Sequence, residues 1–182
     1  MLRWHDRTEN RAGLTDQDEL NEFEFAMYLS RAEEPLPTGD LGYEHYRRIH
    51  HHLFQDVYDW AGQRRSVRIG KGGNWFCYPE HLSREMHRAF SLVDPVLTSA
   101  TAQNFAERAA ILLAGINAGH PFREGNGRTQ LAYLALLAAT IGYGFNQDML
   151  DPDRVISAMI ASFSGELLPL TQLISDLIRN PG

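Results

Sequence analysis

Apolar residues recur three and four positions apart along most of this 182-residue chain. Residues at that spacing share one face of a helix, so the pattern predicts amphipathic helices. We therefore expect an all-α fold, a helical bundle. The helices are expected over about residues 15–32, 46–60, 79–93, 101–119, 126–141, from 152 onward and around 170–177.

One segment breaks the helical pattern and predicts a β-hairpin. Arg65–Ile69 alternates polar and apolar residues as a short strand does, and Trp75–Tyr78 can return as its partner. The five residues between them, Gly70-Lys71-Gly72-Gly73-Asn74, have the composition of a turn. The expected fold is therefore a helical bundle that carries one hairpin.

Capping residues indicate where several helices begin. Thr15, followed three residues later by Asp18, has the form of a capping box for the first helix. Pro79 suits the first position of a helix, and Asp151 before Pro152 is typical of a capped start.

Composition indicates one ordinary globular domain over residues 1–182, with 43% hydrophobic and 22% charged residues. No apolar run reaches the roughly 18 residues of a membrane span, so we expect no membrane partner. Cys77 is the only cysteine, which excludes an internal disulfide and favours a reducing, cytoplasmic location, with secretion as an effector left open. The net charge of −6 argues against a broad nucleic-acid surface.

The candidate chemistry is concentrated in His120–Thr129, which joins two apolar helices. Glycines on both sides of Asn126 let the backbone fold closely round a ligand, and the start of the second helix adds unpaired amides and partial positive charge. Arg128 can bind a phosphate, Glu124 can hold Mg²⁺ beside phosphates, and His120 can act as a general base. These are the parts that phosphoryl-type transfer requires.

The same segment resembles the Fic signature, His-x-Phe-x-Asp/Glu-Gly-Asn-Gly-Arg-x-x-Arg, at every position but the last. By residue frequencies a chance match is rare, roughly one in a million. The resemblance extends over about residues 14–178 through Tyr58–Gly62, Ile69–Gly73 and Gly165–Leu170, in the family's usual order. The chain thus resembles the Fic/Doc superfamily, and in particular Fic toxin-type protein adenylyltransferases.

The resemblance implies an AMPylase, an enzyme that moves AMP from ATP to a tyrosine, threonine or serine hydroxyl of another protein. His120 would deprotonate that hydroxyl, Glu124 would bind Mg²⁺, and Phe122 would pack beneath the loop. The nucleotide phosphates would be bound by an anion hole and one arginine, namely Gly125, Asn126, Gly127 and Arg128.

The predicted hairpin resembles the family's flap, whose strand edge pairs with the main chain of the target. By this resemblance the target would dock on Ile69, Gly70, Lys71, Gly72 and Gly73. Phe163, just ahead of Gly165, falls where relatives line the adenosine side of the pocket.

The chain departs from the signature at its closing arginine, where it has Leu131. In AMP-transferring relatives that arginine helps to hold the γ-phosphate, so its loss leaves Arg128 alone on the triphosphate tail. Leu131 also extends the apolar stripe of its helix. Two alternatives therefore stay open, a Doc-like protein kinase that uses the γ-phosphate and a catalytically degenerate Fic-fold binding protein. Gly125 and Gly127 favour AMP transfer, because Doc proteins typically have alanine and lysine there.

Many relatives are inhibited by a helix that carries Ser/Thr-x-x-x-Glu-Gly/Asn. Thr15–Glu19 and Ser162–Glu166 each match only half of this pattern, because leucine follows the glutamate. We therefore expect inhibition by a separate small antitoxin that supplies such a helix. In the absence of the closing arginine, Arg128 is the candidate partner for its glutamate.

Two further groups of residues, three histidines and three arginines, are not assigned to the catalytic chemistry. The adjacent residues His50–His52 point in different directions on a helix, so we expect them to be solvated or packed individually rather than to bind zinc. Arg64, Arg65 and Arg68 are expected to be exposed flap charges that attract an acidic target.

Overall fold

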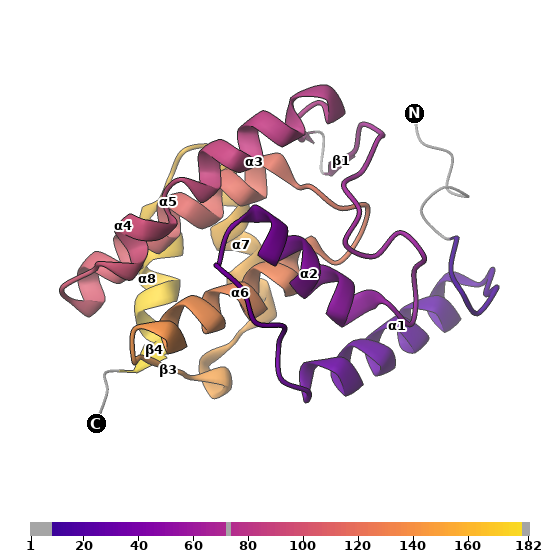
Figure 1. The fold of residues 1–182 in the computed structure, drawn as a ribbon, viewed down its shortest axis with the longest axis horizontal. Coiled ribbons are helices and arrows are strands. Elements are labelled where there is room, and N and C mark those ends of the chain that lie inside the picture. Colours follow the sequence, from indigo (N-terminus) through magenta and orange to yellow (C-terminus); the bar gives the residue numbers. More distant parts are fainter. Residues whose placement is uncertain (1–8, 72–73, 180–182) are drawn as a thin grey trace. The chain divides into compact units, whose positions relative to one another are not determined.

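The computed structural model describes residues 9–71 and 74–179, and its elements are traced in Figure 1. The chain divides into two compact units. The first runs to Ser83 and takes in His120–Thr129, and the second comprises Arg84–Gly119 and the chain from Gln130 onward. Almost all regular structure is helical, which confirms the all-α prediction.

The first unit is built on two helices that pack together, α1 (Gln17–Ala32) and α2 (Tyr43–Phe54). The hairpin follows as β1 (Gly70–Lys71) and β2 (Asn74–Trp75), and the 3₁₀ turn η2 (Pro79–His81) leads into α3 (Leu82–Phe90). Pro79 opens η2, as its sequence position predicted. The unit boundary falls within α3 and again within α6 (Asn126–Thr140).

The second unit contains α4 (Val93–Leu97), α5 (Ala102–Gly119), α7 (Pro152–Phe163) and α8 (Leu168–Leu177). Helix α5 packs on α4, α7 and α8, and α7 also packs on α8. The predicted apolar stripes are fully buried, with exposed fractions of 0–1%. These buried residues are Phe105, Ala109, Leu112, Leu113, Ile116, Leu170, Leu173, Ile174 and Leu177. The predicted cap Asp151 accepts bonds from the amides of Asp153 and Arg154.

Several helix bounds differ from the prediction. The helix expected over residues 79–93 is divided into η2 and α3, and α4 was not predicted. The cap of α1 is Asp16 rather than Thr15, because the Asp16 carboxylate accepts the amides of Asp18 and Glu19. Helix α2 ends at Phe54, whereas the apolar spacing predicted a helix to Trp60. Val57 and Trp60 are nevertheless buried, so the turn that follows α2 still places both side chains in the core.

A hairpin forms in the predicted segment, but its strands are shorter and lie largely in the predicted turn, with Gly70 paired to Trp75 and Lys71 to Asn74. One further bond, from the Phe76 amide to the Ile69 carbonyl, continues the pairing. Arg65 does not join a strand, because its amide bonds to the carbonyl of Pro121 instead. Gly72 and Gly73 lie outside the described residues.

A second short pairing was not predicted. β3 (Gly144–Phe145) pairs antiparallel with β4 (Ile178–Arg179), and the 3₁₀ turn η3 (Gln147–Met149) follows β3. The partners are far apart in sequence and no turn signal joins them, so the pattern could not reveal the pairing. Within residues 9–71 and 74–179, no helix has the length and apolar content needed to cross a bilayer.

Candidate functional site

The loop 120–125 and the first turn of α6 lie entirely within the first unit. Two of its own residues fold the loop back on itself. The Asn126 side chain accepts the Phe122 amide at 3.0 Å and donates to the Phe122 carbonyl at 2.9 Å. The Thr129 hydroxyl donates to the Gly125 carbonyl at 2.8 Å. The Asn126 side chain is 3% exposed, and both of its hydrogen bonds go to the backbone of the loop. An anion bound here would therefore contact backbone amides of the loop and not the side-chain amide of Asn126.

Two distant residues hold further carbonyls of the loop. His50 on α2 bonds to the Glu124 carbonyl at 3.0 Å. Arg65 donates from its side chain to the His120 carbonyl at 2.7 Å and from its amide to the Pro121 carbonyl at 2.9 Å. Most loop carbonyls are thus bonded to the protein. The amides of the first turn of α6 begin a helix, where no intrahelical acceptor exists for them. Amides at a helix start are of the kind that can bind an anion.

Gly125 and Gly127 differ in whether the surrounding structure leaves room for a side chain. Gly125 has φ +76°, and a Cβ there would lie 2.5 Å from the Phe54 ring, so packing alone excludes any side chain. Gly127 is exposed, and a Cβ there would meet nothing within 4 Å. The packing of the fold therefore does not explain glycine at 127, in contrast to Gly125.

His50 is fully buried, and its partners fix its tautomer. The Gly62 amide donates to Nδ1 at 2.8 Å, so the proton resides on Nε2, which donates to the Glu124 carbonyl. Burial lowers the pKa of His50 to about 3, so the ring is neutral at physiological pH. Its ring stacks on Phe122, with centroids 3.7 Å apart. Phe122 is 0% exposed and lies beneath the loop, as predicted.

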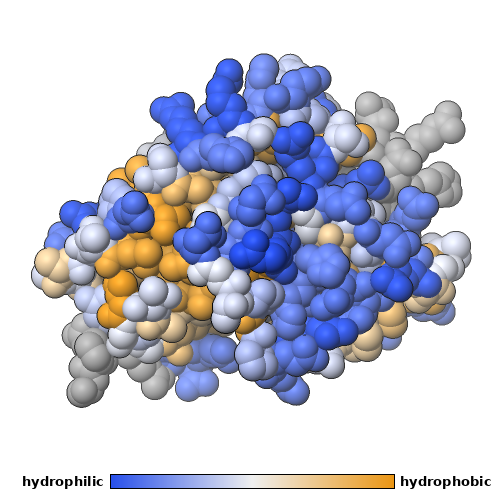
Figure 2. Space-filling view, in the orientation of Figure 1, coloured by the Kyte–Doolittle hydropathy of each residue, from blue (hydrophilic) through white to orange (hydrophobic). Residues whose placement is uncertain are grey.

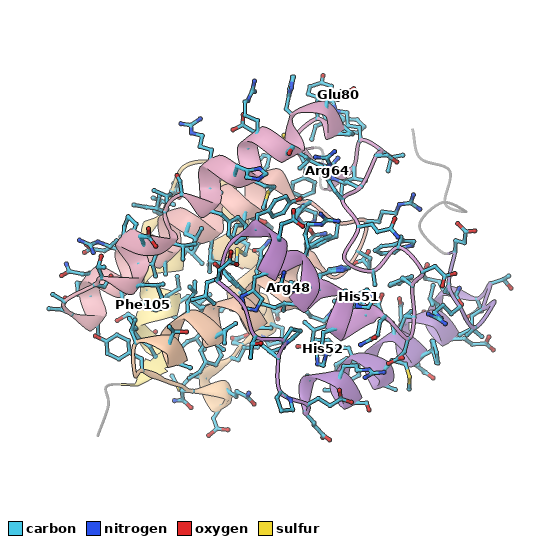
Figure 3. The ribbon with its side chains drawn as sticks, in the orientation of Figure 1. Arg48, His51, His52, Arg64, Glu80 and Phe105 are labelled. Carbon is cyan, nitrogen blue, oxygen red and sulfur yellow. The ribbon has the colours of Figure 1, made fainter. Side chains whose placement is uncertain are left out.

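The three histidines of α2 behave individually, as the sequence predicted. His50 points inward, His51 is exposed, and His52 bonds to the carbonyl of Arg31 at 3.0 Å. Figure 3 labels His51 and His52 beside Arg48, and Figure 2 shows hydrophilic colour over this outer face of α2. No group of three metal-ligating side chains occurs in the part of the chain that the structure describes.

His120 has an unusual backbone. Its φ is +49°, a left-handed value that costs free energy for a residue with a side chain. The ring is half-buried and stacks face to face on Phe76 of the flap, with centroids 3.8 Å apart and planes 13° apart. The base predicted from sequence is therefore held by the flap on one side and by its own carbonyl bond to Arg65 on the other.

Arg128 is held by three groups that the sequence did not reveal. It donates to the carboxylate of Glu24 on α1, whose other oxygen accepts the Tyr58 hydroxyl proton. The guanidinium also lies over the rings of Phe54 and Tyr28, 4.8 and 5.1 Å from their centroids. Burial, together with Glu24, raises the pKa of Tyr58, which stays a neutral donor. The arginine expected to contact phosphate is thus fixed in orientation.

Glu124 is exposed beside the loop, and one carboxylate oxygen accepts the Gly125 amide at 3.2 Å. A single carboxylate fits the prediction of Mg²⁺ here, because magnesium bound with a nucleotide takes most of its remaining ligands from phosphates and water.

The other predicted site residues are distributed as follows. Ile69 has a buried side chain, 5% exposed, and its carbonyl accepts the Phe76 amide. Gly70 and Lys71 form β1. Phe163 ends α7 and is half-buried in the second unit. Leu131 is also half-buried on α6, where it follows the apolar stripe of that helix.

The two partial inhibitory patterns have structural explanations. Glu19 and Glu166 are both exposed. Ser162 is buried and bonds to the Met159 carbonyl of its own helix at 2.8 Å, which is an ordinary helix contact. The carboxylate that does contact Arg128 belongs to Glu24, outside both patterns.

The expectation for Arg65 was wrong. It was predicted as an exposed flap charge, like Arg64 and Arg68, but it is 1% exposed. Arg64 and Arg68 are exposed as expected, and Arg68 lies over the Trp75 and Tyr78 rings, 4.4 and 4.0 Å from their centroids. Only tertiary contacts distinguish Arg65 from its neighbours, so the sequence carried no signal for its burial.

Comparison with known proteins places these residues in context. The model of the Fic/DOC family matches residues 40–138. A "Probable protein adenylyltransferase y4lH" of Sinorhizobium fredii is 52% identical over 172 residues, which cover 93% of this chain and 90% of that protein. "Protein adenylyltransferase VbhT" of Bartonella schoenbuchensis is 34% identical over 93% of this chain, but the match spans only 36% of VbhT.

Solved structures agree in fold. The BepC protein of Bartonella tribocorum with bound AMPPNP has a TM-score of 0.86 at 23% identity, covering 96% of this chain and 92% of that one. An N-terminal Fic domain from Bartonella quintana with bound ADP has a TM-score of 0.84 at 25% identity, covering 94% of this chain and 90% of that one.

Proposed function

The chain belongs to the Fic/DOC family, and from this premise we propose that it is a protein adenylyltransferase that moves AMP from ATP to a hydroxyl side chain of another protein. The observation that carries the proposal is the loop itself. It unites a histidine base, a carboxylate, an oriented arginine and the amides of a helix start, with open space at Gly127. The relative that is 52% identical is named a probable protein adenylyltransferase.

The residues act on the target hydroxyl and on the triphosphate. His120 takes the proton of the hydroxyl, and the oxygen forms a bond to the α-phosphorus of ATP. The bond from that phosphorus to the bridging oxygen breaks, and pyrophosphate leaves. The loop amides and the Arg128 guanidinium bind the negative charge of the phosphates. Because Glu24 and two rings already orient Arg128, little freedom is lost when phosphate binds.

Glu124 would hold Mg²⁺, which when bound neutralises charge on the phosphates. The exposed carboxylate next to the loop supports this assignment. Phe163 would line the adenosine side of the pocket, an assignment that rests on the family resemblance.

Leu131 favours a second candidate, a protein kinase that transfers the γ-phosphate. Without an arginine at 131, only Arg128 of the signature arginines is present to hold the triphosphate tail. The identity of residue 127 weighs against the kinase, because this chain has glycine where Doc proteins typically have a lysine.

For partners, we propose a target protein that docks on the flap and a separate small antitoxin. The antitoxin would bring a glutamate toward Arg128. The exposed positions of Glu19 and Glu166 support a source outside the two partial patterns, since neither carboxylate contacts Arg128; Glu24, which does contact it, belongs to neither pattern. A small protein that copurifies with the chain and lowers its activity would be this partner.

The test uses the purified chain with Mg²⁺, a lysate as the source of targets, and ATP labelled on either the α- or the γ-phosphate. Label that enters protein from α-labelled ATP alone, and that is lost in His120→Ala, supports AMP transfer. Label from γ-labelled ATP alone would replace the proposal with a kinase. Label that is unchanged in His120→Ala would remove the assigned base.

A further inference from the structure

Arg65 is the largest fully buried side chain among the described residues. Burying an arginine is costly unless its donors are bonded, because the guanidinium carries a charge that water would otherwise solvate. Burial lowers the pKa of Arg65 to about 10, which leaves it charged at neutral pH. Arg65 directly follows Arg64, which is exposed and is labelled in Figure 3. Because burial of Arg65 is costly, it requires contacts that compensate for it.

The Arg65 guanidinium bonds to three carbonyls from three segments. Nε donates to His120 at 2.7 Å, Nη1 to Val67 at 2.7 Å, and Nη2 to Cys77 at 2.6 Å. Val67 lies on the arm that enters the hairpin, and Cys77 lies on the arm that leaves it. One planar side chain therefore joins both arms of the flap to the loop that bears the base.

A lysine cannot reproduce this arrangement. The guanidinium presents its donors in a fixed plane, whereas a lysine ammonium is a single compact centre at the end of a flexible stem. A lysine at 65 would keep the charge, yet it could not span three carbonyls that lie on different segments. The charge and the geometry of Arg65 are thus separable by substitution.

His120 depends on this clamp in two ways. Its left-handed backbone, at φ +49°, persists only if surrounding contacts hold it, and the bond from Arg65 to its carbonyl is such a contact. Its ring stacks on Phe76, the neighbour of Cys77, whose carbonyl Arg65 also holds. The base and the flap are therefore fixed relative to each other through both backbone and ring.

We propose that Arg65 is a positioning residue that sets the register between the target-docking flap and His120, so that a hydroxyl presented on the flap meets the base in line with the α-phosphate. The inference rests on the proposed function, because it assigns the flap to the protein substrate. In this proposal the flap that binds the target and the loop that carries the base are held in one arrangement by Arg65, which contacts neither substrate.

The test compares Arg65→Lys with Arg64→Lys, a matched control that makes the same change on the exposed neighbour. α-Labelled ATP and a dilution series of lysate give the rate of label transfer as a function of lysate and of ATP concentration. For Arg65→Lys we expect transfer per unit of lysate to fall by about 10- to 100-fold, as for small misplacements of reacting groups. The KM for ATP should change by less than about twofold, because the phosphate-binding residues are untouched. Arg64→Lys makes the same chemical change and keeps the exposed positive charge of the flap, so the fold-change for Arg65→Lys is measured relative to Arg64→Lys.

Thermal unfolding and ADP binding establish that each variant is folded. Should Arg65→Lys fail to fold, Phe76→Leu serves in its place, because Phe76 is half-exposed and its ring links the flap to His120. It should show the same split between transfer and KM for ATP. A folded Arg65→Lys with wild-type transfer, or a loss confined to KM for ATP, would overturn the inference.

Hydrogen exchange gives a readout that does not depend on activity. Arg65→Lys should raise amide exchange at residues 74–77 and at His120 and Phe122 together, while Arg64→Lys should not. Unchanged exchange at both segments would show that no clamp exists. If the wild type labels no protein, the proposed function fails, and the exchange comparison still decides whether Arg65 fixes the flap to His120.

Discussion

The two units of this protein are held by different forces. The second unit is an apolar core in which α5 packs on α4, α7 and α8 through buried apolar side chains. The first unit buries apolar residues as well, but its loop 120–129 is fixed by polar side chains that bond to backbone carbonyls. Apolar packing tolerates many sequences with similar shape, whereas each carbonyl bond needs one donor in one place. The first unit, which contains the candidate site, should therefore tolerate fewer substitutions at its loop than the second unit tolerates in its core.

The largest loss of stability is expected from the apolar unit. Leu113→Ala on α5 removes a fully buried side chain and should lower the free energy of unfolding by about 2–5 kcal/mol. Urea unfolding of the variant and the wild type measures this difference. The activity of the protein that remains folded should be near normal, and a loss of activity without a loss of stability would break the comparison between the units.

A comparable loss is expected within the loop, but from backbone geometry. Gly125→Ala places a Cβ 2.5 Å from the Phe54 ring at a residue with φ +76°. Strain and overlap together should cost about 2–4 kcal/mol and displace the loop, so activity should fall as well. Thermal unfolding and transfer from α-labelled ATP measure the two effects. Normal activity in this variant would show that the loop does not need its observed path.

The buried imidazole of His50 should make the stability of the protein depend on pH. Its pKa is lowered to about 3 from an ordinary value of 6.5, so the unfolded chain binds more protons once the pH falls below that ordinary value. This contribution is complete above about pH 6.5 and is lost as pH falls, by up to about 1.4 kcal/mol per pH unit. Urea unfolding at several pH values should give a shallower dependence in His50→Gln than in the wild type. Equal slopes would contradict a buried neutral His50.

Gly127→Ala should have the smallest effect on stability of these substitutions and a large effect on activity. Gly127→Ala meets no atom within 4 Å and replaces glycine in a helix, so it should stabilise the protein by about 0.5–1 kcal/mol. Its methyl group should nevertheless obstruct the approach of phosphate and raise the KM for ATP. Thermal unfolding and the ATP dependence of transfer test both parts. Unchanged ATP dependence would remove Gly127 from the phosphate site.

The same contrast explains what the sequence could predict. Helical spacing of apolar residues predicted α5 and α8 with their buried faces, because periodicity directly reports which face is buried. Local caps such as Asp151 were also predicted, since they depend on neighbouring residues. The signature located His120, Glu124 and Arg128 close together in sequence, and the structure places them in the loop 120–125 and the first turn of α6, all in the first unit.

The partners of that loop could not be predicted. Arg65 and His120 are separated by 55 residues, and His50 and Glu124 by 74. Arg64 and Arg65 are adjacent and identical in type, so the sequence does not indicate which of the two is buried. Only the contacts in the folded structure distinguish them. Glu24 is a further case, because its position on α1 looks like any other acidic residue of a solvated helix until Arg128 is placed beside it.

The most direct test of the proposed activity is mass spectrometry of lysate proteins that the purified chain has modified in the presence of ATP and Mg²⁺. The account predicts a tyrosine, threonine or serine side chain that carries AMP, and no such adduct with His120→Ala. A side chain that instead carries a single phosphate, present with the wild type and absent with His120→Ala, would contradict AMP transfer and identify the chain as a kinase.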